Sequence, residues 1–165
     1  MIPSKILRFL DQDGNLAFAG TRSHDLVPHG HRVSGWRAST DGLTLTAFIN
    51  EHSTAQLIES LEDNHSFAMT IEQFPTHETY QFKGRYLGQR PIIREDIEVV
   101  DRIRARLVKS FRPLYPHAPD VLADWFVGTP CLAVEFRVEE IYLQTPGPGA
   151  GARLVPEEEK GSRAR

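Results

Sequence analysis

The segment LTLTAFINEHSTAQLIESLEDNHSFAMTIEQFPTHETYQFKG, residues 43–84, decides the fold. It begins with LTLTAFI, in which large apolar residues alternate with smaller or polar ones, the pattern of a half-buried strand. A short helix with a Ser-Thr start follows, and then two more strands joined by a turn that contains Pro75. These elements cannot bury such large apolar faces alone, so we predict a closed or split β-barrel with a helix at its edge.

The flanking sequence adds strands on both sides of this segment and helices at three places. We expect helices at residues 2–10, 92–111 and 119–127, and strands at residues 16–22, 26–39 and 131–143. Pro28 and Gly30 interrupt the second of these strands, which indicates a sheet edge or a bulge where a ligand could approach the backbone closely. In the helix after Pro91, acidic residues come first and basic residues last, the order of a solvated face that complements the helix dipole.

After the last strand, the sequence TPGPGAG at residues 145–151 is expected to end regular structure. The charged tail EEEKGSRAR has almost no apolar residues, so it is predicted to be disordered. We therefore predict one folded domain over residues 1–145, followed by a Pro/Gly loop and tail over residues 146–165.

Composition narrows the function classes. The chain has 165 residues, of which 40% are hydrophobic and 25% charged, as in an ordinary globular domain. Its net charge of −3 gives no electrostatic basis for binding nucleic acid. The lone Cys131 excludes an intramolecular disulfide and a cysteine-based zinc site. No apolar run approaches the length of a membrane helix, so we expect a cytoplasmic protein.

Three histidines, His24, His29 and His31, cluster in the sequence near Arg22 and Arg32. Their spacing fits no standard zinc motif, and we predict no metal site. We expect them to be solvent-facing loop residues.

The order of the motifs resembles the flavin-binding split barrel of the pyridoxamine 5′-phosphate oxidase family. The resemblance covers roughly residues 16–142 and is carried by RVSGW, LTLTAFIN, EHSTAQL, FAMTIE and TYQFKGRYLG in this order, with QTPGPGAG after the last strand. It implies a mainly β fold with flanking helices: a six-stranded antiparallel split β-barrel. It also implies a homodimer that binds flavin mononucleotide (FMN) across the subunit interface.

The same resemblance implies which residues bind FMN. They lie on one strand, at a strand-helix junction and on a later strand: Arg32, Val33 and Ser34; Phe48, Ile49, Ser53 and Thr54; and Thr79, Gln81 and Lys83. Physical chemistry favours the junction for the phosphate, because backbone N–H groups and hydroxyls at a helix start attract anions.

The chain departs from the family in two places. The oxidases carry an Arg-Lys pair just after the serine of the helix start, where this chain has Thr54 and Ala55. Positive charge for the phosphate must then come from Arg32, Lys83, Arg85 or a histidine. The segment that recognises pyridoxal phosphate is also missing after Tyr142, so we do not expect oxidation of pyridoxamine phosphate.

The sequence thus predicts an FMN-binding flavoprotein, a small oxidoreductase whose partners are FMN, a second copy and a small substrate or nicotinamide electron donor. No residue is indicated as a general acid or base, so no catalytic residue is assigned. Two alternatives stay open, a flavin-binding module without turnover and a haem-binding split barrel. Turnover with a reduced nicotinamide would distinguish the first, and a Soret band the second. Trp36 and Trp125 are interpreted as core or interface anchors.

Overall fold

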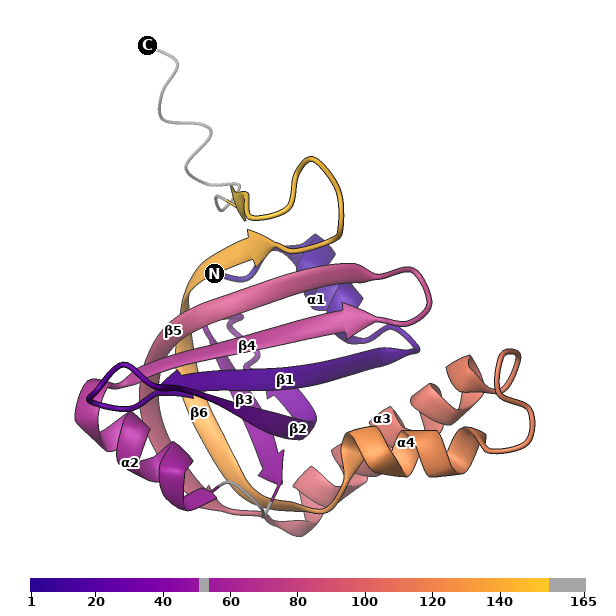
Figure 1. Cartoon of the computed structure of the whole chain (residues 1–165), viewed down its shortest axis with the longest axis horizontal. Helices are drawn as coiled ribbons and strands as arrows, with labels where there is room; N and C mark the ends of the chain where they lie inside the picture. The colour runs from indigo at the N-terminus through magenta and orange to yellow at the C-terminus, as the bar shows by residue number, and fades with distance from the viewer. Residues whose placement is uncertain (51–53, 155–165) are drawn as a thin grey trace.

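Six antiparallel strands close into a barrel, and four helices pack around it (Figure 1). The computed structural model describes residues 1–50 and 54–154. The strands are β1 (Asn15–Arg22), β2 (Pro28–Ala38), β3 (Thr44–Asn50), β4 (Ser66–Gln73), β5 (Glu78–Pro91), β6 (Pro130–Leu143) and β7 (Arg153–Leu154). The helices are α1 (Ser4–Leu10), α2 (Thr54–Asn64), α3 (Arg94–Phe111) and α4 (Pro119–Val127).

The barrel closes because β3, at one end of the strand order β3-β2-β1-β4-β5-β6-β7, also pairs with β6. The prediction of a six-stranded antiparallel barrel is therefore confirmed. Pro28 stands at the first position of β2, opposite Arg22, and the bulge lies farther along, between Val33 and Gly35. At the start of a strand, a residue without an N–H group disturbs the ladder least.

Alternation along the strands fills the barrel with large apolar side chains. Leu45, Ala47 and Ile49 of β3 are completely buried, as are Phe82 of β5 and Phe136 of β6. Such alternation gives each strand one buried face, which is why a period-2 pattern predicted these strands correctly.

The first two helices lie near opposite ends of β2. Helix α1 is joined to the β2–β3 turn through the Ile2 N–H, which donates to the Gly42 carbonyl at 2.8 Å. Helix α2 lies near the β1–β2 turn, where the Asn64 amide donates to the Arg22 carbonyl at 2.9 Å. No helix in the described part of the chain is long and apolar enough to cross a membrane.

Helices α3 and α4 lie side by side and extend to one side of the barrel (Figure 1). Helix α3 crosses β2 at Gly35, where a Cβ atom would lie only 3.1 Å from Ile103 Cδ1 and 3.2 Å from Val100 Cγ2. A larger residue at this position would require these side chains of α3 to move by a few tenths of an ångström. Asp96, in the first turn of α3, is completely buried, although the sequence predicted a solvated face there.

Regular structure continues slightly beyond the predicted domain boundary. After the turns of residues 145–152, β7 returns to β6, with Leu154 opposite Ile141. Leu154 packs against the hydrophobic core, so residues up to 154 belong to the folded domain. The tail EEEKGSRAR, residues 157–165, which is predicted to be disordered, lies outside the described residues.

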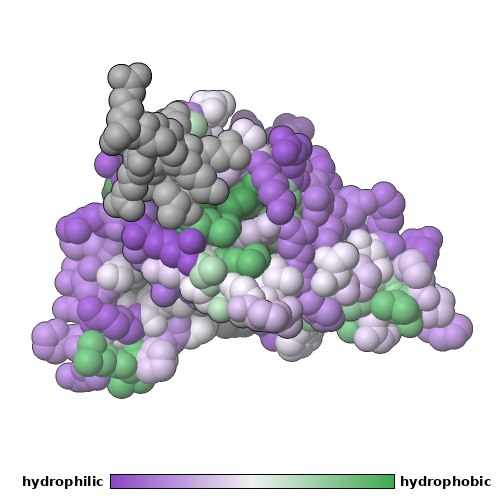
Figure 2. Space-filling model, turned by 90° about the horizontal axis from the view of Figure 1, so that it is seen from above, coloured by the Kyte–Doolittle hydropathy of each residue, from purple (hydrophilic) through white to green (hydrophobic). Residues whose placement is uncertain are grey.

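Apolar surface is gathered in separate patches on a largely hydrophilic exterior (Figure 2). Phe18 of β1 and Val121 and Trp125 of α4 are 42%, 68% and 54% exposed, respectively. Phe126 connects the two aromatic residues, because its ring centroid lies 6.5 Å from that of Phe18 and 4.8 Å from that of Trp125. Val121 lies about one helical turn before Trp125 on α4. We call Phe18, Val121 and Trp125 the α4 patch.

Candidate functional site

Arg32, the first residue of the implied FMN site, is held in a defined position by α4. Its guanidinium carbon lies 4.2 Å from the centroid of the Trp125 ring, and its Nη1 donates to the Trp125 carbonyl at 2.9 Å. A cation over an indole face is favourable, and the hydrogen bond fixes the orientation of the guanidinium. The side chain remains half-buried at the surface of β2.

The end of β3 lies beside Arg32. Val33 pairs with Ile49, and the Ser34 hydroxyl donates to the Asn50 side-chain oxygen. Gly128, just after α4, approaches the same Asn50 amide so closely that a Cβ there would lie 2.3 Å from its nitrogen. Strand β2, the end of β3 and the end of α4 therefore meet where the chain passes toward α2.

The residues implied at this junction differ in accessibility. Val33, Ser34, Phe48 and Ile49 are buried, and the Ser34 hydroxyl is already bonded to Asn50. Val33, Phe48 and Ile49 have no polar side-chain atoms, so only their backbone groups could bind a ligand. Helix α2 begins at Thr54, and Ser53 lies outside the described residues.

A row of paired residues connects Arg32 with the implied residues of β5. Arg32 is opposite Phe18, Phe18 is opposite Thr70, and Thr70 is opposite Gln81. Three strand spacings separate the ends of this row, about 14 Å at roughly 4.8 Å each. The Gln81 amide donates to the Thr70 hydroxyl at 3.3 Å and is half-buried.

The two other implied residues of β5 are placed differently. Thr79 is buried, and its hydroxyl donates to the His77 carbonyl at 2.8 Å. Lys83 is exposed, with its ammonium 4.6 Å from the centroid of the Tyr142 ring. Of these two, only Lys83 presents a charged group at the surface.

Lys83 also borders a hollow of about 430 Å³ beside the row. Its lining is formed by Gly20, Thr21, Arg22, Ser66, Phe67, Ala68, Lys83, Gly84, Glu139 and Glu140. Gly20 is paired with Gly30, and a Cβ at either position would meet no atom within 4 Å among the described residues. Packing within the described chain therefore does not require glycine at these two strand positions.

Sequence reasoning missed a second polar site, where two arginines share a buried carboxylate. Arg37 Nη2 donates to Asp96 Oδ1 at 2.7 Å, and Arg90 donates to both carboxylate oxygens at 2.5 and 3.1 Å. The Ile93 N–H adds a bond of 3.1 Å to Asp96 Oδ2. Burial of Asp96 favours the neutral acid, but these hydrogen bonds and the two positive charges outweigh it and lower its pKa.

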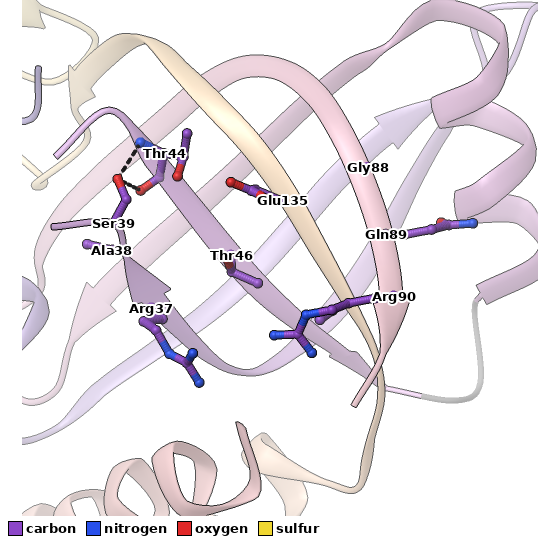
Figure 3. A pocket seen from close by; sticks show the side chains of 10 residues that line it. Arg37, Ala38, Ser39, Thr44, Thr46, Gly88, Gln89, Arg90 and Glu135 are labelled. Atoms are coloured by element: carbon purple, nitrogen blue, oxygen red, sulfur yellow. Dashed lines mark hydrogen bonds between the residues drawn. The ribbon is translucent and has the colours of Figure 1, made fainter. Parts of the chain in front are cut away.

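This cluster borders a cavity of about 340 Å³ on the outer side of four neighbouring strands (Figure 3). Its lining is formed by Arg37, Ala38, Ser39, Thr44, Thr46, Gly88, Gln89, Arg90, Ala133 and Glu135. Along β2, the contact of α3 with Gly35 separates Arg37 from Arg32. None of the residues implied for FMN lines this cavity.

The expectation that these histidines are solvent-facing loop residues is wrong at His31, and His29 also lies within β2 and is half-buried. His31 lies within β2, only 2% exposed, with Nε2 at 2.9 Å from the Thr21 hydroxyl. Its Nδ1 has no hydrogen-bond partner among the described residues. Burial, followed by the nearby charge of His29, lowers the pKa of His31.

His24 is exposed, as expected, and lies 3.3 Å from Asp63. Among the described residues, no group of three His, Cys, Asp or Glu side chains could hold a metal ion.

Comparison with known proteins gives a result at the level of the fold. No protein-family model matches the sequence, and no curated protein matches it. HupZ of Group A Streptococcus has a TM-score of 0.55 at 18% identity, and the match covers 92% of this chain and 99% of HupZ. An F420 reductase has a TM-score of 0.56 at 12% identity, covering 85% of this chain and 98% of the reductase.

A pyridoxamine 5′-phosphate oxidase-related FMN-binding protein from Nostoc punctiforme also matches. Its TM-score is 0.44 at 12% identity, and the match covers 86% of this chain and 80% of the other. At sequence identities this low, the similarity is one of fold. The chain therefore shares its overall fold with HupZ and the F420 reductase.

Proposed function

We propose that this protein binds FMN, with the phosphate near Arg32 and the start of α2 and the flavin ring over β1, β4 and β5. The observation that carries the proposal is the pairing row from Arg32 to Gln81. This row is about 14 Å long. That length suits FMN, with its phosphate at the Arg32 end and its flat three-ring flavin extending toward Gln81. Bound flavin would supply the redox chemistry, and the protein would position it.

At the phosphate end, Arg32 replaces the positive charge of the missing Arg-Lys pair. Within the described chain, only its Nη1 donates a hydrogen bond, so the other guanidinium N–H groups can receive phosphate oxygens. A phosphate desolvated without a cation would be costly, and Trp125 holds this cation beside the junction. Ser53 and Thr54 are proposed to add hydroxyl and backbone donors at the helix start.

At the ring end, the bare backbone of Gly20 and Gly30 allows a flat ligand to approach the strands closely. Glycine inside a strand costs roughly 0.5–1 kcal/mol relative to alanine and often marks such an approach. Gln81 can exchange its long bond to Thr70 for a bond to a polar edge of the ring. Lys83, at the border of the hollow, would favour electron-rich flavin through its positive charge.

A titration of FMN and riboflavin tests the phosphate end. Arg32→Ala should weaken FMN binding by about 1.5–3 kcal/mol, because a charged hydrogen bond is lost, and should leave riboflavin binding nearly unchanged. Trp125→Ala should give a smaller loss in the same direction, since Arg32 remains but is no longer held. Fluorescence quenching measures both ligands.

Arg8→Ala is the control, because Arg8 is exposed on α1, away from the row. If Arg32→Ala lost the same affinity for FMN and for riboflavin, Arg32 would not belong to the phosphate site.

An absorption spectrum with a Soret band in place of flavin bands would favour the haem-binding alternative. If the protein preferred F420 to FMN, the proposed ring site would stand but its cofactor would be F420. If FMN bound without turnover of reduced nicotinamide, the protein would be a flavin-binding module.

A further inference from the structure

A second row of paired residues crosses the cavity beside Asp96, and it carries one positive and one negative charge. Arg37 on β2 is opposite Thr46 on β3, Thr46 is opposite Glu135 on β6, and Glu135 is opposite Gly88 on β5. The row therefore presents a cation, a hydroxyl, a carboxylate and a position without a side chain. Figure 3 shows Arg37, Thr46, Glu135 and Arg90 around the same cavity.

The cation end of this row is rigidly built. Asp96 is 0% exposed and holds Arg37 and Arg90 from two different strands, while the two arginine side chains remain 43% and 42% exposed. Within the described chain, Arg37 donates only one hydrogen bond, from Nη2. Its Nε and Nη1 donors are thus fixed near the cavity and available to an acceptor.

The carboxylate end has unused capacity as well. Glu135 makes no hydrogen bond or ion pair within the described chain, and its negative charge acts on Arg90 only at longer range. The Thr46 hydroxyl has no hydrogen-bond partner there either, and a Cβ at Gly88 would meet nothing within 4 Å. A ligand therefore has both room and free acceptors beside Glu135.

We propose that this cavity binds a small zwitterion, with its carboxylate at Arg37 and Thr46 and its ammonium group at Glu135. A simple anion would be repelled by the carboxylate of Glu135, and a simple cation would be repelled by the two arginines. Only a molecule with both charges gains at both ends. This site is separate from the proposed flavin site, because α3 packs between Arg37 and Arg32.

The spacing of the row limits the size of the ligand. Two strand spacings place the Cα atoms of Arg37 and Glu135 about 10 Å apart, and the two side chains reduce the gap that the ligand must bridge. A short chain of carbon atoms between carboxylate and ammonium satisfies this distance. The chemical class is therefore an amino acid or a short ω-amino acid.

Calorimetric titration with a graded series of probes tests the proposal. Glycine, β-alanine, 4-aminobutyrate and 6-aminohexanoate carry the same two charges at increasing separation, and acetate and ethylamine carry one charge each. At least one zwitterion should bind about tenfold or more tightly than acetate and ethylamine, as expected when two charged hydrogen-bonding ends act together.

Variants assign the two ends. Arg37→Gln should weaken the best zwitterion about tenfold, and the fold is retained because Arg90 and the Ile93 N–H still bond Asp96. Glu135→Gln should remove the preference for the zwitterion over acetate, and it breaks no hydrogen bond within the described chain. Arg8→Gln and Glu62→Gln, exposed charges elsewhere, should change nothing.

The outcome is decisive in either direction. Equal affinities for the zwitterion, acetate and ethylamine, or no binding at millimolar concentration, would overturn the proposal. FMN titrations of Arg37→Gln and Glu135→Gln should match the wild type. Loss of zwitterion binding alone thus leaves the flavin proposal standing, and loss of FMN binding alone leaves this one standing.

Discussion

Single residues in this protein acquire their roles from partners far away in the sequence. Arg32 is oriented by Trp125, which follows it by 93 positions, and Arg37 is oriented by Asp96. The Trp125 ring holds the guanidinium of Arg32, and the buried Asp96 carboxylate holds that of Arg37. Both guanidinium groups still have N–H groups that make no hydrogen bond within the described chain. An arginine fixed in this way loses less conformational freedom when a ligand binds.

His31 gives the protein a pH dependence of known sign. The unfolded chain binds a proton at the ordinary histidine pKa of 6.5, whereas the buried ring in the folded state has a lowered pKa. Stability is therefore fully present above this value and declines as the pH falls below 6.5 toward the folded-state pKa. Thermal melting at a series of pH values should show the decline.

The control for this prediction is His31→Gln, which keeps a polar group near Thr21 but cannot titrate in this range. Its melting temperature should fall less between neutral and mildly acidic pH than that of the wild type. Equal slopes for the two proteins would mean that His31 does not cause the pH dependence.

At the scale of elements, local sequence patterns predicted the positions of the helices and strands. Alternation predicted strands such as β3, β5 and β6, and apolar spacing predicted helices such as α3, because each pattern reflects which face an element buries. The Arg37–Asp96–Arg90 cluster could not be found in this way. Its members are joined by strand register and by the approach of α3 to Gly35, which no short segment encodes.

The candidate FMN site illustrates the same limit. The resemblance implied Phe48 and Ile49, and the structure buries both side chains in the hydrophobic core. The sequence already indicated that Gly30 could let a ligand approach the backbone, whereas the role of Gly20 became visible only from its pairing with Gly30. The pairing of His31 with Thr21 across two strands was hidden for the same reason.

Strand β7 allows a test of where the domain ends. Removal of residues 155–165 should leave the melting temperature unchanged, because that segment has almost no apolar content. Removal of residues 145–165 should lower it, since Leu154 leaves the core and the ladder bonds of Leu143 to Ala152 and Gly151 are lost. A loss of about 1–3 kcal/mol is expected from one partly buried leucine and two hydrogen bonds.

Calorimetry or chemical denaturation of the two truncated chains measures this difference. If both truncations leave stability unchanged, β7 contributes nothing and the predicted boundary at residue 145 is the better description. If the shorter truncation already destabilises the protein, the tail has a role that its composition does not indicate.

At the scale of the whole molecule, the α4 patch has the properties of a protein contact. Phe18, Val121 and Trp125 are large and exposed, Phe126 contacts both Phe18 and Trp125, and Trp125 also holds Arg32. An aromatic patch of this kind next to a ligand site favours burial in an interface. We therefore propose that two copies associate through this patch and that the dimer encloses the phosphate end of the flavin site.

The test introduces one charge into the patch and one outside it. Val121→Glu should dissociate the dimer, because a carboxylate buried without a partner costs several kcal/mol, whereas Val121 is 68% exposed in the single chain and its replacement should not unfold it. Leu26→Glu is the matched control, equally exposed at 68% but on the β1–β2 turn. In sedimentation at micromolar concentration, wild type and Leu26→Glu should have twice the chain mass of 18.7 kDa, and Val121→Glu should have that mass alone. FMN should bind more weakly to the dissociated variant, since Trp125 and Arg32 would then be exposed to water. A wild-type protein of single-chain mass that still binds FMN would show that the flavin site needs no second copy.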